Sequence, residues 1–374
     1  MKEIGIGVIG WGFMGKTHTH ALRDMCLFYP GMNFSPRLVS ICSRRLEMAE
    51  QAKQQMGFVH ATDDYRELLA RQDVQLVSIC TPNQEHERMA LDAIAAGKHI
   101  YIDKPVAMDA AAAERIHRAA MDKGVLAQVA LNNRFWPATI RAKQLVDEGR
   151  IGQILGFNAR YLHSGSIDPN KPIGWKQGTQ GGVLLDLGSH ALDIITWLVG
   201  QPARVMCSLR QLYPERPGQD GQSVRDLGDD QALIMLRLPD GALGTVEASK
   251  IATGAEDELS FEVYGTKGAL RFSMMEGDWL YFFDNAQKDV AYGGERGYQR
   301  IACVARYAAP GGSFLPPKNR IGWDRPHMHC YYSFLDCVAN GGQPSPDLAD
   351  GARLQRLMEL CRASHEKQAW VDVR

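Results

Sequence analysis

The glycine-rich segment Gly10–Gly15 constrains the fold of this chain more than any other stretch. It has the spacing GxGxxG, it follows a β-branched run at 4–9, and it opens a helical pattern over 14–27. In this context the first glycine permits a tight turn, the second lets the backbone approach a pyrophosphate, and the third lets helix and strand pack closely. The alternative is a plain glycine-rich turn. We expect a dinucleotide at the helix N-terminus, with these candidate contacts: Gly10, Trp11, Gly12, Phe13, Met14 and Gly15.

Strand-like and helical segments then alternate as far as residue 130. This rhythm predicts a doubly wound parallel sheet, in which ligands lie beyond the carboxyl ends of the strands. Two such ends carry polar groups, Thr81-Pro82-Asn83 and Asp103-Lys104-Pro105, and His86 follows the first of them. We expect both ends to face the cofactor, and the Lys104–Pro105 bond can be cis. The expected strands are 38–42, 58–60, 74–80, 99–102 and 125–130, and the expected helices are 64–70, 85–96 and 110–123.

The end of the second expected strand bears on the choice of cofactor. An NAD-preferring site places a carboxylate there to accept from the ribose hydroxyls. This chain has Ser43, Arg44 and Arg45 instead. Ser43 and Arg44 could bind a 2′-phosphate through charge-assisted hydrogen bonds. The sequence therefore favours NADP(H) over NAD(H), although Arg44 could also stack on adenine and Arg45 could simply be solvated.

The second part of the chain has a different rhythm. With 374 residues, two domains are expected, 1–130 and 131–374, and the final helices can pack back on the first domain. Hairpin signals predict an antiparallel meander whose broad apolar face suits dimer or tetramer formation. The expected helices are 137–147, 326–338 and 348–366, and the expected strands are 154–162, 203–209, 230–238, 243–251, 258–264, 269–272 and 279–283.

The segment 181–193, GGVLLDLGSHALD, places Asp186 and His190 about one helical turn apart near the start of a helix that stops at Gly200. A carboxylate and an imidazole so arranged can move a proton near neutral pH. On these residues alone the structural alternative is favoured, with Asp186 as a helix cap and His190 as a satisfied, half-buried imidazole.

Charge and composition bear on the binding partners and on the cellular compartment of the protein. A formal net charge of −1 gives no electrostatic case for a nucleic-acid or anionic membrane partner. The first ten residues read as a strand and not as a signal peptide. The eight cysteines form no CxxC pair, which favours a reducing cytoplasm, and the pairs His18/His20 and His327/His329 lack further ligands, so no metal is expected.

Three motifs in order, GWGFMG, DKP at 103–105 and GGVLLDLGSHALD, resemble the glucose–fructose oxidoreductase / inositol dehydrogenase (Gfo/Idh/MocA) family over most of the chain. The resemblance implies a Rossmann domain followed by an α/β domain with a large, open, mostly antiparallel sheet. It also implies oxidation or reduction of sugars or polyols with NAD(H) or NADP(H). By motif match, Lys104, Asp186 and His190 are the family's catalytic residues. Asp103 departs from the family's usual glutamate but keeps the charge.

The sequence therefore predicts an NADP(H)-preferring oxidoreductase for a sugar, polyol or cyclitol, in which Lys104, Asp186 and His190 also bind substrate. His190 would take the hydroxyl proton, Lys104 would stabilise the same oxygen, and Asp186 would bind a neighbouring hydroxyl; lysine and histidine could exchange roles. Two alternatives stay open: a nucleotide-binding sensor without turnover, and a glycosidase that oxidises transiently and recycles its cofactor. Weaker candidate substrate contacts, each with a packing alternative, are Asn132, Arg134, Tyr161 and Trp175.

Overall fold

The computed structural model describes residues 1–174, 181–218, 220–225 and 228–373. The chain divides into two compact units: unit 1 holds residues 1–135 and 305–355, and unit 2 holds residues 136–304 and 356–374. The domain boundary after residue 130 remains a prediction.

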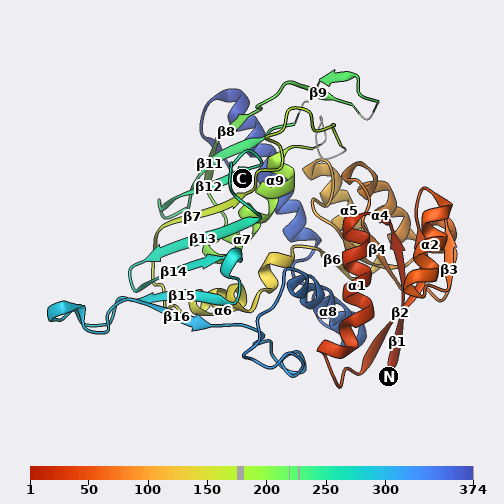
Figure 1. Cartoon of the computed structure of the whole chain (residues 1–374), viewed down its shortest axis with the longest axis horizontal. Helices are drawn as coiled ribbons and strands as arrows, with labels where there is room; N and C mark the ends of the chain where they lie inside the picture. Colours follow the sequence, from red (N-terminus) through yellow and green to blue (C-terminus); the bar gives the residue numbers. More distant parts are fainter. Residues whose placement is uncertain (175–180, 219, 226–227, 374) are drawn as a thin grey trace. The chain divides into compact units, whose positions relative to one another are not determined.

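Unit 1 is built on a six-stranded sheet with the order β3-β2-β1-β4-β5-β6 (Figure 1), and every neighbouring pair is parallel. The order reverses between β1 and β4, which is where doubly wound sheets bind dinucleotides. The predicted fold class is confirmed for this unit. Its strands are β1 (Lys2–Ile9), β2 (Phe34–Cys42), β3 (His60–Thr62), β4 (Leu76–Ile79), β5 (His99–Ile102) and β6 (Ala127–Val129). Its helices are α1 (Phe13–Phe28), α2 (Leu46–Met56), α3 (Tyr65–Ala70), α4 (His86–Ala95), α5 (Ala110–Lys123) and α8 (Asp324–Asn340), with 3-10 turns η1 (Asn83–Glu85) and η2 (Asn132–Phe135).

Strand β2 begins at Phe34, earlier than the expected Leu38, although Pro36 lies inside it. A proline has no N–H for a sheet ladder and is tolerated where one side of the strand is unpaired. Pro36 pairs with Ile4 of β1, whereas β3 pairs only with the last part of β2, from Ser40 onward. The early start is therefore compatible with the proline. Strand β3 lies two residues later than expected.

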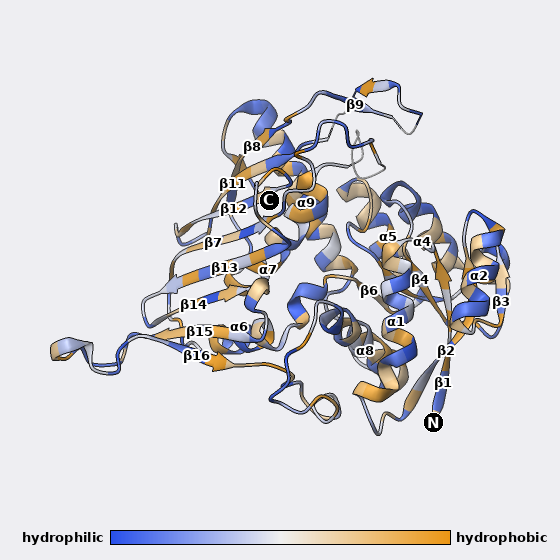
Figure 2. Ribbon diagram, viewed as in Figure 1, coloured by the Kyte–Doolittle hydropathy of each residue, from blue (hydrophilic) through white to orange (hydrophobic). Residues whose placement is uncertain are grey.

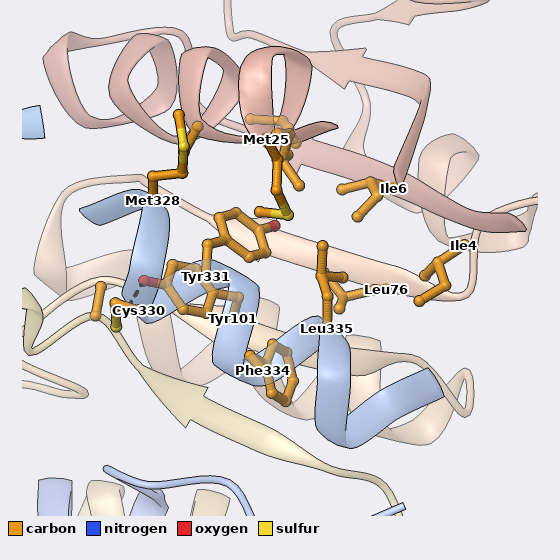
Figure 3. Close-up of a cluster of buried hydrophobic side chains, with 14 of the residues drawn as sticks. Ile4, Ile6, Met25, Leu76, Tyr101, Met328, Cys330, Tyr331, Phe334 and Leu335 are labelled. Carbon is orange, nitrogen blue, oxygen red and sulfur yellow. Dashed lines mark hydrogen bonds between the residues drawn. The ribbon is translucent and has the colours of Figure 1, made fainter. Parts of the chain in front are cut away.

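The core of unit 1 forms where α8 packs against the sheet and α1 (Figure 3). The rings of Tyr101 from β5 and Tyr331 from α8 stack with their centroids 4.0 Å apart. Phe334 and Leu335, on the same helix, are fully buried. A helix some 200 residues away in sequence therefore completes the hydrophobic core of the dinucleotide-binding sheet.

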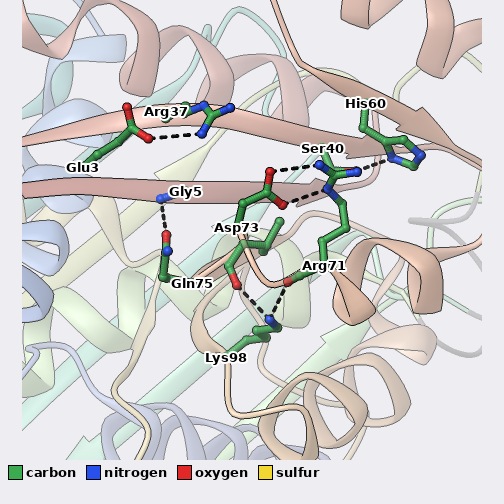
Figure 4. Close-up of polar contacts among 10 residues, drawn as sticks. Glu3, Gly5, Arg37, Ser40, His60, Arg71, Asp73, Gln75 and Lys98 are labelled. Atoms are coloured by element: carbon green, nitrogen blue, oxygen red, sulfur yellow. Dashed lines mark hydrogen bonds and ion pairs between the residues drawn. The ribbon is translucent and has the colours of Figure 1, made fainter.

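At the amino ends of the strands, side chains satisfy main-chain groups (Figure 4). Lys98 Nζ donates to the carbonyl oxygens of Arg71 and Val74 at 2.8 Å each. The side-chain oxygen of Gln75 accepts from Gly5 N. Since a buried main-chain group without a partner costs free energy, these contacts stabilise the loops at this edge. The opposite, carboxyl edge carries the candidate cofactor residues.

Unit 2 is built on a nine-stranded sheet with the order β16-β15-β14-β13-β7-β12-β11-β8-β17. The β7–β12 pair is parallel, and the other pairs in this sheet are antiparallel within the described part of the chain. The expected large, mostly antiparallel sheet is confirmed. Its strands are β7 (Ile154–Leu162), β8 (Arg204–Arg210), β11 (Gln231–Arg237), β12 (Leu243–Ser249), β13 (Glu258–Gly265), β14 (Gly268–Ser273), β15 (Trp279–Asp284), β16 (Tyr298–Ala302) and β17 (Val371–Asp372).

Hydropathy and burial alternate along these strands (Figure 2). Helices α6 (Pro137–Asp147) and α7 (Ser189–Val199) pack on one face. On the other face Leu233 of β11 and Leu243 of β12 are each about half exposed, at 50% and 51%. Helix α9 (Leu348–Lys367) contributes residues to both units. Short elements complete unit 2: β9 (Glu215–Pro217), β10 (Ser223–Arg225), the π-helical turn η3 (Leu184–Gly188), and the 3-10 turns η4 (Met274–Glu276) and η5 (Ala291–Gly293).

Two features of unit 2 differ from the sequence expectation. Helical structure starts at Leu184, because a π-helical turn precedes α7, whereas the sequence placed Asp186 at the lip of the helix. In the described part of the chain no side chain caps either start, so the interpretation of Asp186 as a helix cap is wrong. Regular structure also occurs in the polar segments 213–227 and 284–320, where the sequence supports no assignment of helix or strand: they contain the β9–β10 hairpin and β16, respectively.

All eight cysteines are free thiols. Across the described residues, none of the helices combines the length and the apolar character that a membrane crossing requires. The same residues contain no group of three or more His, Cys, Asp or Glu side chains that could hold a metal ion.

Several histidines are enclosed in the core of unit 1. Burial lowers the pKa of His18 to about 4 and that of His329 to about 3. His18 Nδ1 lies 2.9 Å from Ser78 Oγ, and His329 Nδ1 lies 2.6 Å from Tyr29 Oη. These imidazoles are neutral in the folded protein at pH 7. The unfolded chain takes up protons near pH 6.5, so stability falls as the pH drops below that value.

We predict that replacing His329 by glutamine weakens this acid sensitivity. A histidine with a folded pKa of about 3 and an unfolded pKa of 6.5 costs the folded state about 2 kcal/mol between pH 7 and pH 5. Urea unfolding followed by circular dichroism at both pH values measures the loss. The control is His117→Gln, at a half-buried position on α5. An equal loss in wild type and His329→Gln would contradict the prediction.

Candidate active site

The glycine loop of unit 1 joins β1 to α1. Gly10 has φ +103°, and a Cβ on it would lie 2.5 Å from the carbonyl oxygen of Cys80. A Cβ on Gly15 would lie 2.0 Å from Gly10 O. At Gly12, by contrast, no atom of the described residues lies within 4 Å of where a Cβ would stand. The first and third glycines are thus required by close packing, and the second leaves open space.

Gly12 is the N-cap residue of α1, and the first helical hydrogen bond runs from Lys16 N to Gly12 O at 3.1 Å. The main-chain N–H groups of Phe13, Met14 and Gly15 therefore have no partner within the helix. A helix N-terminus with open space beside it fits the pyrophosphate of a dinucleotide. Trp11 is buried beside Phe58, with the ring centroids 6.4 Å apart, so its side chain is part of the core.

The carboxyl ends of β4 and β5 are joined by one imidazole. His86 is fully buried, with Nδ1 2.9 Å from Pro105 O and Nε2 2.9 Å from Thr81 O. Burial lowers its pKa, and the charge of Asp103 opposes this. Both ring nitrogens are occupied by main chain, so we expect His86 to position the two loops rather than to contact the cofactor itself. The segment it braces contains Pro82 and the buried Asn83.

Lys104 lies in the second of these loops. Its main-chain N donates to Asp103 Oδ1 at 2.8 Å, and the bond to Pro105 is cis. The positive charge of Lys104 also contributes to the lowered pKa of His327, after burial and the neighbouring His18. A neutral, buried imidazole therefore lies within electrostatic reach of the candidate catalytic lysine.

Asn132 and Arg134 belong to η2 and are both buried. Arg134 Nη1 lies 3.2 Å from Asp350 Oδ2, with the two side chains 8% and 20% exposed. An ion pair of this kind fixes the turn, which supports the packing alternative for Arg134. The substrate-binding role of both residues stays a prediction.

The candidate residues of unit 2 meet at one edge of its sheet. Strands β7 and β12 run parallel, with Leu162 opposite Ser249, so Tyr161 and Lys250 lie at the same end. Strand β13 is antiparallel to β7 and begins opposite Leu162, which brings Asp257 to this edge. Strand β11 begins opposite Ser249, which brings Asp229 to it as well. The register thus gathers four distant segments of the chain.

Main-chain contacts fix the segment that carries Asp186 to this edge. Val183 N donates to Asp229 O, and Leu184 N donates to Asp229 Oδ2, both at 2.7 Å. Burial raises the pKa of Asp229, and the bond from Leu184 opposes that shift. In the turn that follows, Asp186 Oδ2 lies 3.0 Å from Lys250 Nζ. Asp186 is thus the partner of a lysine and does not cap the helix.

His190, in the first turn of α7, is 9% exposed. Its ring centroid lies 5.8 Å from that of Tyr161. Burial raises the pKa of Tyr161 well above its usual value, and the charge of Asp257 and its hydrogen bond with Tyr161 add to the rise, so Tyr161 is a neutral donor. Burial and then the charge of Lys250 lower the pKa of His163. The predicted pair Asp186/His190 therefore lies among Tyr161, His163, Lys250 and Asp257.

Arg216 fixes the beginning of the loop that follows β7. Its guanidinium donates to the carbonyl oxygens of Asp168 and Ser166 at 2.7 Å each. Trp175, a predicted substrate contact, lies outside the described residues.

Sequence reasoning missed Lys250, Asp229, Asp257 and His163. Their common signal is position: each flanks the end or the start of a strand at the same edge. The sequence alone does not show this shared position, because it does not show that β7 pairs with β12. Lys104 lies in unit 1 and Asp186 and His190 lie in unit 2.

Comparison with known proteins identifies the family. The profile described as "Oxidoreductase family, NAD-binding Rossmann fold" matches residues 4–131, and "Oxidoreductase family, C-terminal alpha/beta domain" matches residues 143–373. The chain belongs to the Gfo/Idh/MocA oxidoreductase family. This confirms the resemblance and the prediction of a nicotinamide-dependent oxidoreductase.

Three curated relatives of this family member are informative. Levoglucosan dehydrogenase of Pseudarthrobacter phenanthrenivorans is 33% identical over 391 residues, which covers 100% of this chain and 99% of the relative. The scyllo-inositol 2-dehydrogenase (NAD(+)) of Bacillus subtilis is 27% identical over 91% of this chain and 88% of its own length. The scyllo-inositol 2-dehydrogenase (NADP(+)) IolW of the same organism is 29% identical, covering 72% and 71%.

Two solved structures are similar over the whole chain. Levoglucosan dehydrogenase in complex with NADH has a TM-score of 0.93 at 33% identity and covers 100% of both chains. The same enzyme with NADH and levoglucosan has a TM-score of 0.94 at 32% identity, again covering 100% of both chains.

We predict opposite effects for alanine at the first two glycines of the loop. Gly10→Ala forces an L side chain to φ +103° against Cys80 O and should destabilise unit 1 by about 1–3 kcal/mol or more. Gly12→Ala leaves stability unchanged, because its methyl group enters open space. That methyl should raise the Kd for reduced nicotinamide dinucleotide by about tenfold or more.

Urea unfolding measures the first effect and nucleotide fluorescence the second. An undiminished affinity in a folded Gly12→Ala protein would show that the dinucleotide does not approach this loop.

Proposed function

We propose that this chain catalyses the nicotinamide-dependent oxidation of a secondary hydroxyl group on a sugar, anhydrosugar or cyclitol, and the reverse reduction. The observation that carries the proposal is the presence of the half-buried Asp186 and the buried His190 at a polar sheet edge. Full-length similarity to levoglucosan dehydrogenase and to an inositol dehydrogenase supports the substrate class. A polyhydroxylated substrate needs several polar groups at fixed positions, and this edge supplies them.

When bound, the nicotinamide supplies the hydride acceptor. The roles of the chain's own residues follow from the family motifs and their chemistry. His190 takes the proton of the substrate hydroxyl as a general base. Lys104 hydrogen-bonds the same oxygen and stabilises its developing negative charge. Asp186 accepts from a neighbouring hydroxyl, and Tyr161 contributes a further substrate contact.

Dehydrogenase assays test this reaction directly. Wild-type protein is incubated with levoglucosan, scyllo-inositol and myo-inositol, and the absorbance of reduced nicotinamide is followed. Lys104→Ala and His190→Ala should each lower kcat/KM by about 10²–10⁴-fold, since each removes a group that acts on the reacting oxygen. Lys123→Ala, on the exposed end of α5, is the matched control and should be unchanged.

Two outcomes would favour the alternatives. Tight nucleotide binding without turnover across the panel would point to a sensor. Cleavage of a glycoside without net production of reduced nicotinamide would point to transient oxidation with a recycled cofactor. Unchanged turnover in Lys104→Ala would remove that residue from the mechanism.

The preference for NADP(H) over NAD(H) is part of the proposal. It is supported by the half-buried Ser43 and the exposed Arg44 at the end of β2, where no carboxylate stands. The aspartates that follow the neighbouring strand β3 count against a preference for NADP(H). Burial, followed by the carboxylates of Asp64 and Asp63, raises the pKa of Cys42 to about 12, so negative charge lies close to this end of β2. The balance between Arg44 and these aspartates decides the cofactor.

Arg44→Ala measures that balance. If Arg44 binds a 2′-phosphate, the variant should lose about tenfold or more in kcat/KM for NADP while the value for NAD changes little. Equal losses for both cofactors would indicate that Arg44 stacks on adenine, and a wild-type preference for NAD would overturn the proposed preference.

We further propose a homodimer or homotetramer assembled through the open face of the unit 2 sheet, in a reducing cytoplasm. The exposed Leu233, Met235 and Leu243 support this surface. Leu233 and Met235 line a hollow of about 690 Å³ together with Met206 and Thr245. An apolar face of this kind is covered by a partner in many oligomers.

A further inference from the structure

The polar edge of unit 2 contains a buried lysine that the family motifs do not include. Lys250 follows β12, and its side chain is 6% exposed. Its ammonium group lies 3.0 Å from Asp186 Oδ2, and the aspartate side chain is 14% exposed. Lysine is almost never this deeply buried unless it is paired.

The main chain holds Lys250 in place on both sides. Its N–H donates to Asp230 O at 2.9 Å, and its carbonyl oxygen accepts from Ser166 N at 2.8 Å. The preceding Ser249 is paired in the sheet with both Leu162 and Gln231. A flexible four-carbon side chain is thereby anchored on a fixed base, which limits where its ammonium group can reach.

Charged groups surround Lys250 from several elements. Asp186 comes from the π-helical turn, His163 from the end of β7, and Asp229 from the start of β11. The charge of Lys250 acts on His163 and on Asp229. Asp257 and Lys171 also face His163. Lys250 is therefore a buried cation among carboxylates that come from several elements.

Stability alone does not account for this pair. Removing two charges from water costs several kcal/mol per ion, and a buried ion pair is often no more stabilising than apolar side chains of similar volume. What the pair does provide is a carboxylate of fixed charge and orientation at the position where the family motif places a catalytic aspartate.

We propose that Lys250 is a positioning residue for substrate binding: it holds Asp186 as an oriented carboxylate, so that Asp186 can accept a hydrogen bond from a substrate hydroxyl. The inference deepens the proposed function and rests on it. Lys250 acts through Asp186 and donates no proton in the reaction.

Steady-state kinetics with the best substrate and cofactor of the assay panel test this role. Lys250→Met should raise KM for the sugar or cyclitol by about tenfold or more while kcat falls less. Lys250→Arg keeps the cation and should restore KM to within about threefold of wild type. Lys267→Met, at an exposed turn of the same unit, is the matched control and should behave as wild type.

A double-mutant cycle separates action through Asp186 from direct contact with the substrate. In an Asp186→Asn background, Lys250→Met should change KM by less than about twofold, because its partner carboxylate is already absent. The double variant also leaves no unpaired buried charge, which guards against misfolding of Lys250→Met alone. A full-sized effect of Lys250→Met in this background would overturn the proposal, as would loss of kcat at unchanged KM.

The third readout needs no turnover. The pKa of His163, followed by NMR of its ring C–H group in protein without ligands, should rise in Lys250→Met and stay near the wild-type value in Lys250→Arg, because the charge of Lys250 lowers it. An unchanged pKa in Lys250→Met would overturn the placement of the cation. If this shift occurs but no sugar or cyclitol is turned over, the charge arrangement stands and the proposed function fails.

Discussion

The parallel pairing of neighbouring strands is the constraint on which both units depend. In unit 1 it sets the carboxyl ends of β1, β4 and β5 at one edge, where the glycine loop, Thr81 and Lys104 follow them. In unit 2 one parallel pair, β7 with β12, does the same within an otherwise antiparallel sheet. Parallel strands end at the same edge of a sheet. Residues that follow these strands therefore become neighbours in space although they lie far apart in the sequence.

Buried polar side chains that contact the main chain hold the loops at those edges in place. His86 joins two loops of unit 1 through main-chain carbonyl oxygens, and Asp229 anchors the π-helical turn of unit 2 through two main-chain bonds. A buried polar group left without a partner costs about 1–3 kcal/mol, so each of these side chains restricts its loop to one arrangement. The flexible cofactor and substrate therefore meet a scaffold that is already ordered, which lowers the entropy lost on binding.

Local patterns predicted the elements well and the contacts between them poorly. Strand His99–Ile102 and helices Ala110–Lys123 and Pro137–Asp147 have the expected bounds, because apolar periodicity and a closing glycine or proline are local signals. Lys250 escaped notice because β7 and β12 are separated by several other strands and helices, and no local pattern states that they pair. The π-helical turn was missed as well, and the contacts at its start are with Asp229, a residue more than one strand away in sequence.

Asp186 and Asp229 lie at the same sheet edge but have different roles. Asp229 is enclosed, burial raises its pKa, and its hydrogen bonds go to main chain, so it is suited to hold the fold. Asp186, in the turn that Asp229 anchors, faces an ammonium group 3.0 Å away and therefore carries charge. Two carboxyl groups of the same residue type can have separate roles when their surroundings differ in burial and in charge. The position of Asp186 depends on Asp229, because moving Asp229 would move the turn that directs Asp186 toward Lys250.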